Sequence, residues 1–235
     1  MAKAQNVALI KEPFVRNDTL ILLQLSYGVG SEVEMQKAYV EPNWDSEIGK
    51  RLLSFSFAER DRAEYEKAIR NLKNQYPRVL GKHLLAQFPT HWLPLISFRD
   101  KYYVYDWEAY PRWFNDSVYV KYSQDGAVPY LIKSFEKKSN THFQTRVIDA
   151  FSPCSDKIQI IDFYLIHPDN GIAVVRTTFC SDEEKTVSHQ LMVALEKATN
   201  FDIIVWETQL DMPATEELIF DQIDFDKLVR DSKME

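Results

Sequence analysis

Two acidic residues of the chain lie where an enzyme could hold a divalent cation. Asp162 is in the middle of an apolar run at residues 160–163, and Glu207 ends another apolar segment. Carboxylates on neighbouring strands can bind Mg²⁺, which then activates water for hydrolysis. However, the apolar segment after Asp162, residues 172–180, contains no acid, and Glu207 cannot easily replace one. Metal-dependent hydrolysis is therefore an alternative interpretation of this sequence, not the leading one.

The other residue types that commonly carry catalysis show no complete pattern. The five histidines are scattered, without the i, i+4 spacing of a metal site. Residues 27–31 match only the opening of a Gly-x-Gly-x-x-Gly loop. The chain has six glycines, where average usage predicts roughly sixteen, and this argues against a nucleotide-binding loop. We therefore expect no cofactor and no metal, with Mg²⁺ required only by the hydrolase alternative.

Ten aromatic residues fall within residues 98–122. Such a cluster forms either the core of a sheet or a recognition surface, because aromatic side chains bury large areas and Tyr and Trp also carry a polar tip. Alternation along residues 102–107 divides its aromatic side chains between two faces, which leaves several for a surface. Tyr, Trp and Arg dominate the binding energy of many interfaces. The candidate contact residues are Tyr102, Tyr105, Trp107, Tyr110, Arg112 and Trp113.

The end of the chain is acidic. Residues 211–235 contain eight acidic and three basic residues, so this segment carries most of the net charge of −7. Apolar residues between 219 and 229 are spaced so that one side of the segment could be apolar. Two interpretations follow: the segment docks on its own domain, or it lays its apolar side into a groove of a partner protein, which could be basic.

Composition places the chain among soluble globular proteins. It has 235 residues, of which 45% are apolar and 27% charged. No apolar run approaches the roughly 18 residues of a membrane span, and no basic run indicates binding to nucleic acid. The two cysteines form no disulfide framework. We expect a cytoplasmic protein, or one inside the host cell if it is viral, with no membrane association.

Sequence periodicity predicts an α+β fold. A helix is expected over residues 59–76, and a helical N-terminal region precedes a mixed, largely antiparallel sheet in the C-terminal half, flanked by helices. Strands are expected over 145–151, 157–166 and 172–180, with a Pro-Asp-Asn-Gly turn before the last. A capping box at residues 181–184 then predicts a helix, followed by a strand over 202–207. We expect one domain over 1–235, with 1–94 and 95–235 as its possible helical and sheet-containing subregions.

Taken together, these features favour a non-enzymatic intracellular protein that binds another protein. Accessory subunits, inhibitor or immunity-type proteins and viral assembly proteins all belong to this class. The aromatic segment and the acidic C-terminal segment are the predicted contact regions. The predicted order of strands and helices is also similar to that of the restriction-endonuclease-like core. A divergent, degenerate nuclease of that type, with Asp162 and Glu207 as candidate acids, is the alternative.

Overall fold

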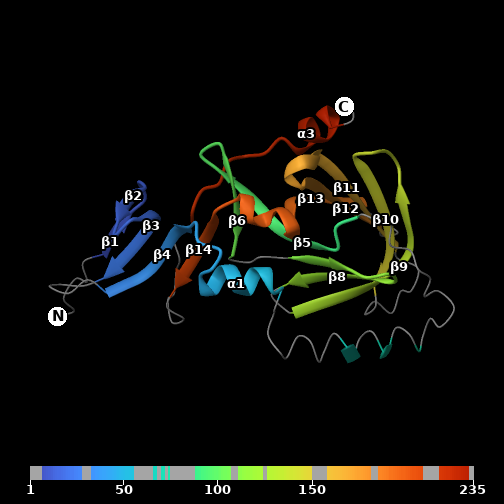
Figure 1. Ribbon diagram of the computed structural model, residues 1–235, viewed down its shortest axis with the longest axis horizontal. Helices are drawn as coiled ribbons and strands as arrows, with labels where there is room; N and C mark the ends of the chain where they lie inside the picture. The colour runs from blue at the N-terminus through green and yellow to red at the C-terminus, as the bar shows by residue number, and fades with distance from the viewer. Residues whose placement is uncertain are drawn as a thin grey trace.

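The chain forms one continuous, largely antiparallel sheet that is closed at one end and open at the other. The computed structural model describes residues 7–27, 33–55, 66–67, 70–71, 74, 88–106, 111–123, 126–149, 158–180, 185–208 and 217–232. Figure 1 shows a closed barrel beside an extended sheet, which we call the wing. Strand β5 (His91–Phe98) pairs within both parts and therefore joins them.

The barrel is closed because eight antiparallel strands pair in a ring. The ring closes where Trp92 of β5 pairs with Arg112 of β7. The turn between β11 and β12 has Gly171 at a φ of 65°, which glycine adopts readily, and this confirms the turn predicted at that position. In ring order the strands are β5, β13 (Lys185–Ala194), β12 (Ile172–Cys180), β11 (Ile158–His167), β10 (His142–Asp149), β9 (Gly126–Lys137), β8 (Val118–Ser123) and β7 (Arg112–Phe114).

The wing extends from β5 and ends in an edge. Its strands follow in the order β6 (Lys101–Tyr105), β14 (Ile203–Thr208), β4 (Val33–Glu41) and β3 (Thr19–Tyr27). Both β1 (Val7–Ile10) and β2 (Phe14–Arg16) pair with β3. The pairing of β14 with β6 is parallel. No other described strand pairs with β1 or β2, so these two strands form the outer edge of the wing.

An aromatic core fills the inside of the barrel. Phe88, which is 5% exposed, lies at its centre, with five rings whose centroids are 4.8 to 5.7 Å from its own. Large rings from several strands therefore meet around Phe88 and pack against one another inside the barrel. The five rings belong to Trp92, Phe114, Phe135, Phe143 and Phe163.

Two further cores lie outside the barrel. One packs the outer wall of the barrel against one face of β6 and β14, and the other covers the opposite face of the wing. Helices α1 (Glu47–Leu53) and α3 (Phe225–Asp231) and the 3-10 helix η2 (Leu195–Asn200) each add one buried residue to the first. A second 3-10 helix, η1 (Pro168–Asn170), lies in the turn before β12.

The predicted α+β fold with a helical N-terminal region is wrong, because residues 7–41 form four strands. The apolar run at residues 20–25 is as typical of a helix as of a doubly buried strand. In β3 every residue from Ile21 to Ser26 is buried, since the sheet is covered on both faces. Described helical positions 66, 67, 70, 71 and 74 do lie within the helix predicted over 59–76.

The helix predicted after residue 181 is also wrong. Residues 181–184, which hold the predicted capping box, lie outside the described residues, and the segment after them is β13. Leu191, Met192, Val193 and Ala194 are all at most 2% exposed, because one face of β13 meets the barrel interior and the other the outer core. Strand β9, Gly126–Lys137, also has buried residues on both faces, such as Leu131 and Ile132. Burial on both faces removes the alternation that marks a strand in a sequence.

Candidate functional site

The predicted contact residues that the structure describes do not lie together on one surface. Tyr102 packs against the outer core, and the ring of Tyr105 lies 5.2 Å from that of Phe220. Trp113 on β7 is partly buried, with its ring 6.1 Å from His91. Arg112 is inside the barrel, and Trp107 and Tyr110 lie outside the described residues. Within the described part of the chain, the predicted set is therefore divided between β6 and β7.

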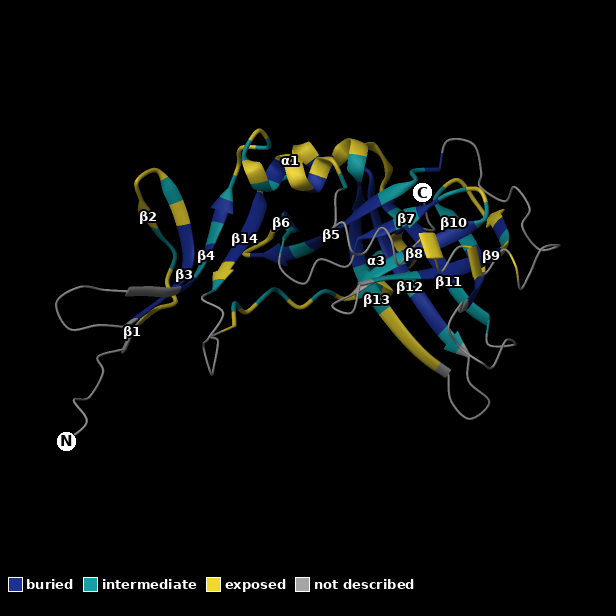
Figure 2. Ribbon diagram, turned by 90° about the horizontal axis from the view of Figure 1, so that it is seen from below, coloured by how far each residue is buried: buried dark blue, intermediate teal, exposed yellow. Residues whose placement is uncertain are grey.

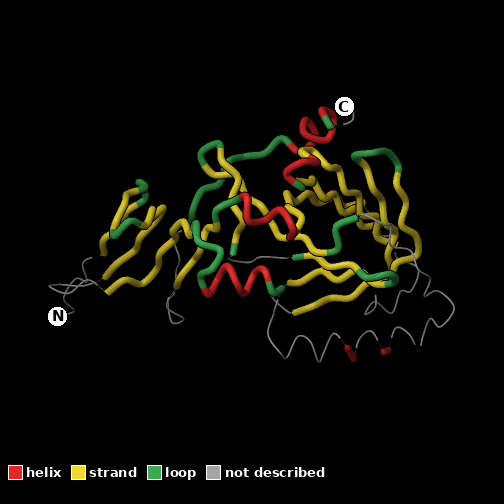
Figure 3. The backbone as a smooth tube through the Cα atoms, in the orientation of Figure 1, coloured by secondary structure: helices red, strands yellow, loops and turns green. Residues whose placement is uncertain are grey.

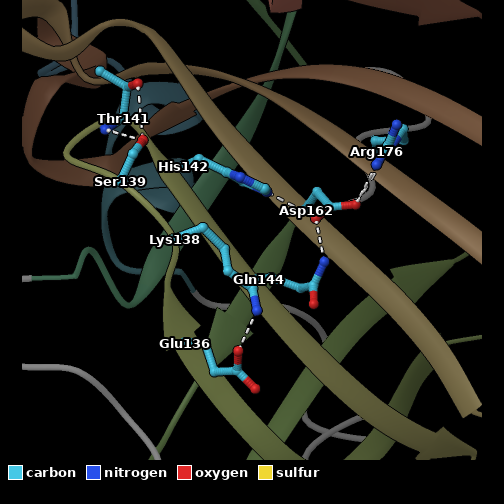
Figure 4. A network of polar contacts seen from close by, with 8 residues as sticks. All are labelled: Glu136, Lys138, Ser139, Thr141, His142, Gln144, Asp162 and Arg176. Carbon is cyan, nitrogen blue, oxygen red and sulfur yellow. Dashed lines mark hydrogen bonds and ion pairs between the residues drawn. The ribbon is translucent and has the colours of Figure 1, made fainter. Parts of the chain in front are cut away.

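Asp162 is held by a network of donors on the outer wall of the barrel (Figure 4). Its Oδ1 lies 2.8 Å from His142 Nε2 and accepts a hydrogen bond of 2.8 Å from Gln144 Nε2. Arg176 donates from Nη2 to Oδ2 at 2.8 Å and from Nε to the same oxygen at 3.3 Å. Strand pairing explains this arrangement, since Gln144 on β10, Asp162 on β11 and Arg176 on β12 lie directly opposite one another.

The Asp162 network also has an aromatic component. The ring of His142 stacks on that of Tyr164, with centroids 4.3 Å apart, and the Arg176 guanidinium lies 5.5 Å from the same ring. Burial raises the pKa of Asp162, but hydrogen bonds from His142, Gln144 and Arg176 outweigh it and lower that pKa to about 2. A carboxylate that is ionised and fully engaged in this way joins three strands and is not available as a base.

No second carboxylate joins Asp162 in the described structure. Glu207, the other candidate acid, accepts a hydrogen bond of 2.9 Å from Tyr39 Oη in the wing. Burial, followed by the hydrogen bond to Glu207, raises the pKa of Tyr39. The described residues contain no group of three or more metal-binding side chains. In addition, the strand and helix order required by the nuclease alternative is absent, because its second helix is β13.

Arg112 forms a second polar cluster, inside the barrel and 3% exposed. Its Nη1 donates to Tyr119 Oη at 2.9 Å and to Thr177 Oγ1 at 3.3 Å, and its Nη2 donates to Gln190 Oε1 at 2.9 Å. All three acceptors are uncharged. Arg112 alternates with the buried Phe114 along β7, so both side chains point into the barrel. Sequence analysis named Arg112 as a candidate contact residue for a protein partner, and the structure places its side chain inside the barrel.

The edge of the wing exposes apolar side chains. Val15 on β2 is 68% exposed, and Leu9 and Ile10 on β1 and Leu20 on β3 are also exposed. Figure 2 shows exposed positions along β2, at the tip of the wing. Four of the seven large apolar residues that the described structure exposes thus lie on its first three strands. Sequence analysis missed this surface, because it assigned the region to helix.

A pocket of about 210 Å³ lies next to this edge. Leu23 and Phe98 line it together with Leu218 and Ile219 of the C-terminal segment, and Lys11, which follows β1, is also in its lining. Leu9 pairs with Leu25, two positions from Leu23, so Leu9 is on the face of the wing that carries the pocket. The edge and the pocket therefore form one surface, which we call the wing-edge surface.

The described C-terminal segment docks on its own domain. Asp221 accepts hydrogen bonds from Ser97 Oγ at 2.7 Å and from the backbone N–H groups of Arg99 and Asp100 at 3.1 and 2.9 Å. These bonds hold the segment against the turn between β5 and β6. Figure 3 shows the path of the backbone in this part of the molecule. At the other end, Thr141 Oγ1 donates to the carbonyl of Ser232 at 3.0 Å. Of the two interpretations of the acidic tail, docking on its own domain describes residues 217–232.

Comparisons with known proteins give no assignment. No family model, curated protein or solved structure matches this chain. Among the described residues, no helix is long and apolar enough to cross a membrane. The fold and the three features above, which are the Asp162 network, the Arg112 cluster and the wing-edge surface, are therefore the basis of any functional argument.

Proposed function

We propose that the protein is a non-enzymatic component that binds another protein through the wing-edge surface. One observation carries this proposal: among the described strands β1 and β2 pair with β3 alone, and apolar side chains are exposed along them. An edge of this kind presents backbone N–H and C=O groups to any extended chain. An intracellular setting, as expected from the composition, is part of the proposal.

The physical basis is addition of a strand from the partner to the edge of the wing. Backbone hydrogen bonds to β1 would supply affinity, while side chains of the added strand, alternating between its faces, would supply specificity. One of those faces is the face of Leu9 and the pocket. An apolar side chain of the partner that enters the pocket would contact Phe98 and Leu218.

An uninterrupted segment of a different protein suits this edge better than a second copy of the chain. The edge is broken between β1 and β2, where Pro13 has no backbone N–H to donate. If two copies of the chain paired antiparallel along their whole wing edges, the break at Pro13 would occur twice in the same ladder of backbone hydrogen bonds. A partner without such a break can instead pair along all of β1. Trp107 and Tyr110 stay predicted contact residues, outside the described structure.

Native mass spectrometry of complexes that contain the chain first identifies the partner. Binding of that partner to the purified full-length chain is then measured. Val15→Asp and Ile10→Lys place charges on the edge, which should oppose strand addition. Val187→Lys is the matched control, because Val187 is exposed on β13 in the barrel. We expect the two edge variants to weaken binding by roughly tenfold or more, while the control binds as the wild type does.

Hydrogen exchange then separates strand addition from other contacts. Binding should protect backbone amides of β1, and the fold of each variant is checked by circular dichroism. If all three variants bind the partner equally well, or if binding protects the barrel and not β1, the proposed interface is wrong. Self-association of the wild type that the edge variants abolish would replace the proposed partner by a second copy. A chain that forms no complex would reject the proposal.

A further inference from the structure

We propose that the Arg112 end of the barrel is a binding site for the acidic group of a small ligand, a carboxylate or a phosphate. This site is inside the barrel and is independent of the wing-edge surface. Four strands build it, with Arg112 on β7, Tyr119 and Lys121 on β8, Thr177 on β12 and Gln190 on β13.

The hydrogen bonds of Arg112 leave capacity for an oxyanion. A guanidinium has five N–H groups, and Tyr119, Thr177 and Gln190 accept hydrogen bonds from three of them. Nε is buried and has no hydrogen-bond partner within the described structure. Nε and Nη2 lie on one edge of the guanidinium, and Nη2 retains one N–H. This pair of donors is the type that binds a carboxylate or phosphate through two parallel hydrogen bonds.

The charge of Arg112 also lacks compensation. Among the described residues, neither Arg112 nor Lys121 forms an ion pair with a carboxylate. The contrast with Arg176 is direct, because that side chain is 38% exposed and still pairs with Asp162. A buried cation without a counterion is strongly disfavoured. An anion at Arg112 would supply the missing charge.

Lys121 adds a second cation to the same place. It lies directly opposite Arg112 in the pairing of β7 with β8, so the two side chains share the inner face of the barrel. Burial lowers the pKa of Lys121, and the charge of Arg112 lowers it further. Two neighbouring cations repel each other, and a bound anion would offset that repulsion.

The packing of the barrel limits the size of the ligand. Beyond Arg112, the interior is filled by the aromatic core around Phe88. Lys121 and Gln190 are only partly buried, so solvent lies nearer on their side of the cluster. The acidic group would therefore bind at Arg112, and the rest of the ligand would extend towards Lys121 and away from the aromatic core.

The test uses the full-length chain with inorganic phosphate and acetate as separate probes, at constant ionic strength. The resonance of the Arg112 Nε–H is followed by ¹⁵N NMR, and the thermal midpoint is followed in parallel, because a ligand that binds the native state raises it. We expect one probe or both to give a saturable shift. The probe that binds more tightly identifies the ligand's acidic group as phosphate or carboxylate.

Variants show whether binding depends on these side chains. Arg112→Gln should abolish the saturable response, and Lys121→Gln, which keeps the fold testable if Arg112→Gln does not fold, should weaken binding by about tenfold or more. Arg99→Gln is the control, since Arg99 is an exposed arginine in the turn after β5. If neither probe saturates, or if Lys121→Gln and Arg99→Gln bind as the wild type does, the inference is wrong and Arg112 is a structural residue.

Discussion

Replacement of Asp162 by Asn should destabilise the protein in a pH-dependent way. The pKa of Asp162 is about 2 in the folded chain, against an ordinary value of 3.8. This difference corresponds to roughly 2 kcal/mol of stability at neutral pH. The variant also removes the carboxylate that pairs with Arg176, although the charge of Asp226 still acts on that side chain. We therefore expect the free energy of unfolding at pH 7 to fall by about 2–4 kcal/mol.

The sign of the pH dependence follows from the lowered pKa. A carboxylate whose pKa is lower in the folded state stabilises that state when it is ionised. Its contribution is complete above the unfolded pKa of about 4 and is lost as the pH falls through the folded value of about 2. Between these two values, the wild type should lose roughly 2 kcal/mol that the Asn variant does not lose. The difference in free energy of unfolding between the wild type and the Asn variant should therefore become smaller by that amount.

Urea unfolding, followed by tryptophan fluorescence and circular dichroism, measures both quantities between about pH 7 and pH 2. Asp169→Asn is the matched control, because Asp169 is an exposed carboxylate in η1. It should change stability by no more than about 0.5 kcal/mol. A difference between wild type and Asp162→Asn that stays constant from pH 7 to pH 2 would refute the electrostatic argument, because the effect would then come from packing alone.

Three further substitutions test the packing and the C-terminal contacts. Gly49→Ala would place a Cβ 2.5 Å from the Trp44 carbonyl oxygen, so chemical denaturation should show a loss of about 1–3 kcal/mol as α1 shifts. Phe88→Ala removes the central ring of the barrel core and should cost about 3–5 kcal/mol in the same assay. Asp221→Ala removes the acceptor for the backbone N–H groups of Arg99 and Asp100, so hydrogen exchange at these two amides should become faster while exchange in β11 stays unchanged.

The sequence predicted strands β10, β11, β12 and β14 because local signals define them, whereas β13 was predicted as a helix. Ile172–Cys180 is bounded by a Pro-Asp-Asn-Gly turn, and Gly171 has the left-handed backbone that this turn requires. Strand β11 has Asp162 between the buried Ile161 and Phe163, which preserves part of the alternation. Strands β3 and β13 lack this alternation, because every residue from Ile21 to Ser26 is buried and because Leu191–Ala194 of β13 divide between two apolar cores.

The candidate sites depend on strand register, and the sequence does not encode register in any local pattern. Asp162 is a polar residue in an apolar strand, which marks it as unusual, but its partners come from β10 and β12. Arg112 was predicted to matter as a member of an aromatic segment. Its position inside the barrel follows from the pairing of β7 with both β5 and β8. Closure of the ring is a long-range property that no window of sequence shows.

Closure of the barrel explains why the two proposed sites differ in kind. Around the ring, each strand pairs with a neighbour on both sides over part of its length, and the proposed site there binds through side chains. Among the described residues, its buried Arg112 pairs with no carboxylate. The wing leaves β5 through β6 and ends at β1 and β2, where backbone groups are unpaired by any described strand. Val15→Asp and Ile10→Lys should therefore weaken partner binding without changing the response to phosphate or acetate. Lys121→Gln should change the response to these anions without changing partner binding. A variant of either site that changed both properties would show that β5, the strand common to the barrel and the wing, couples them.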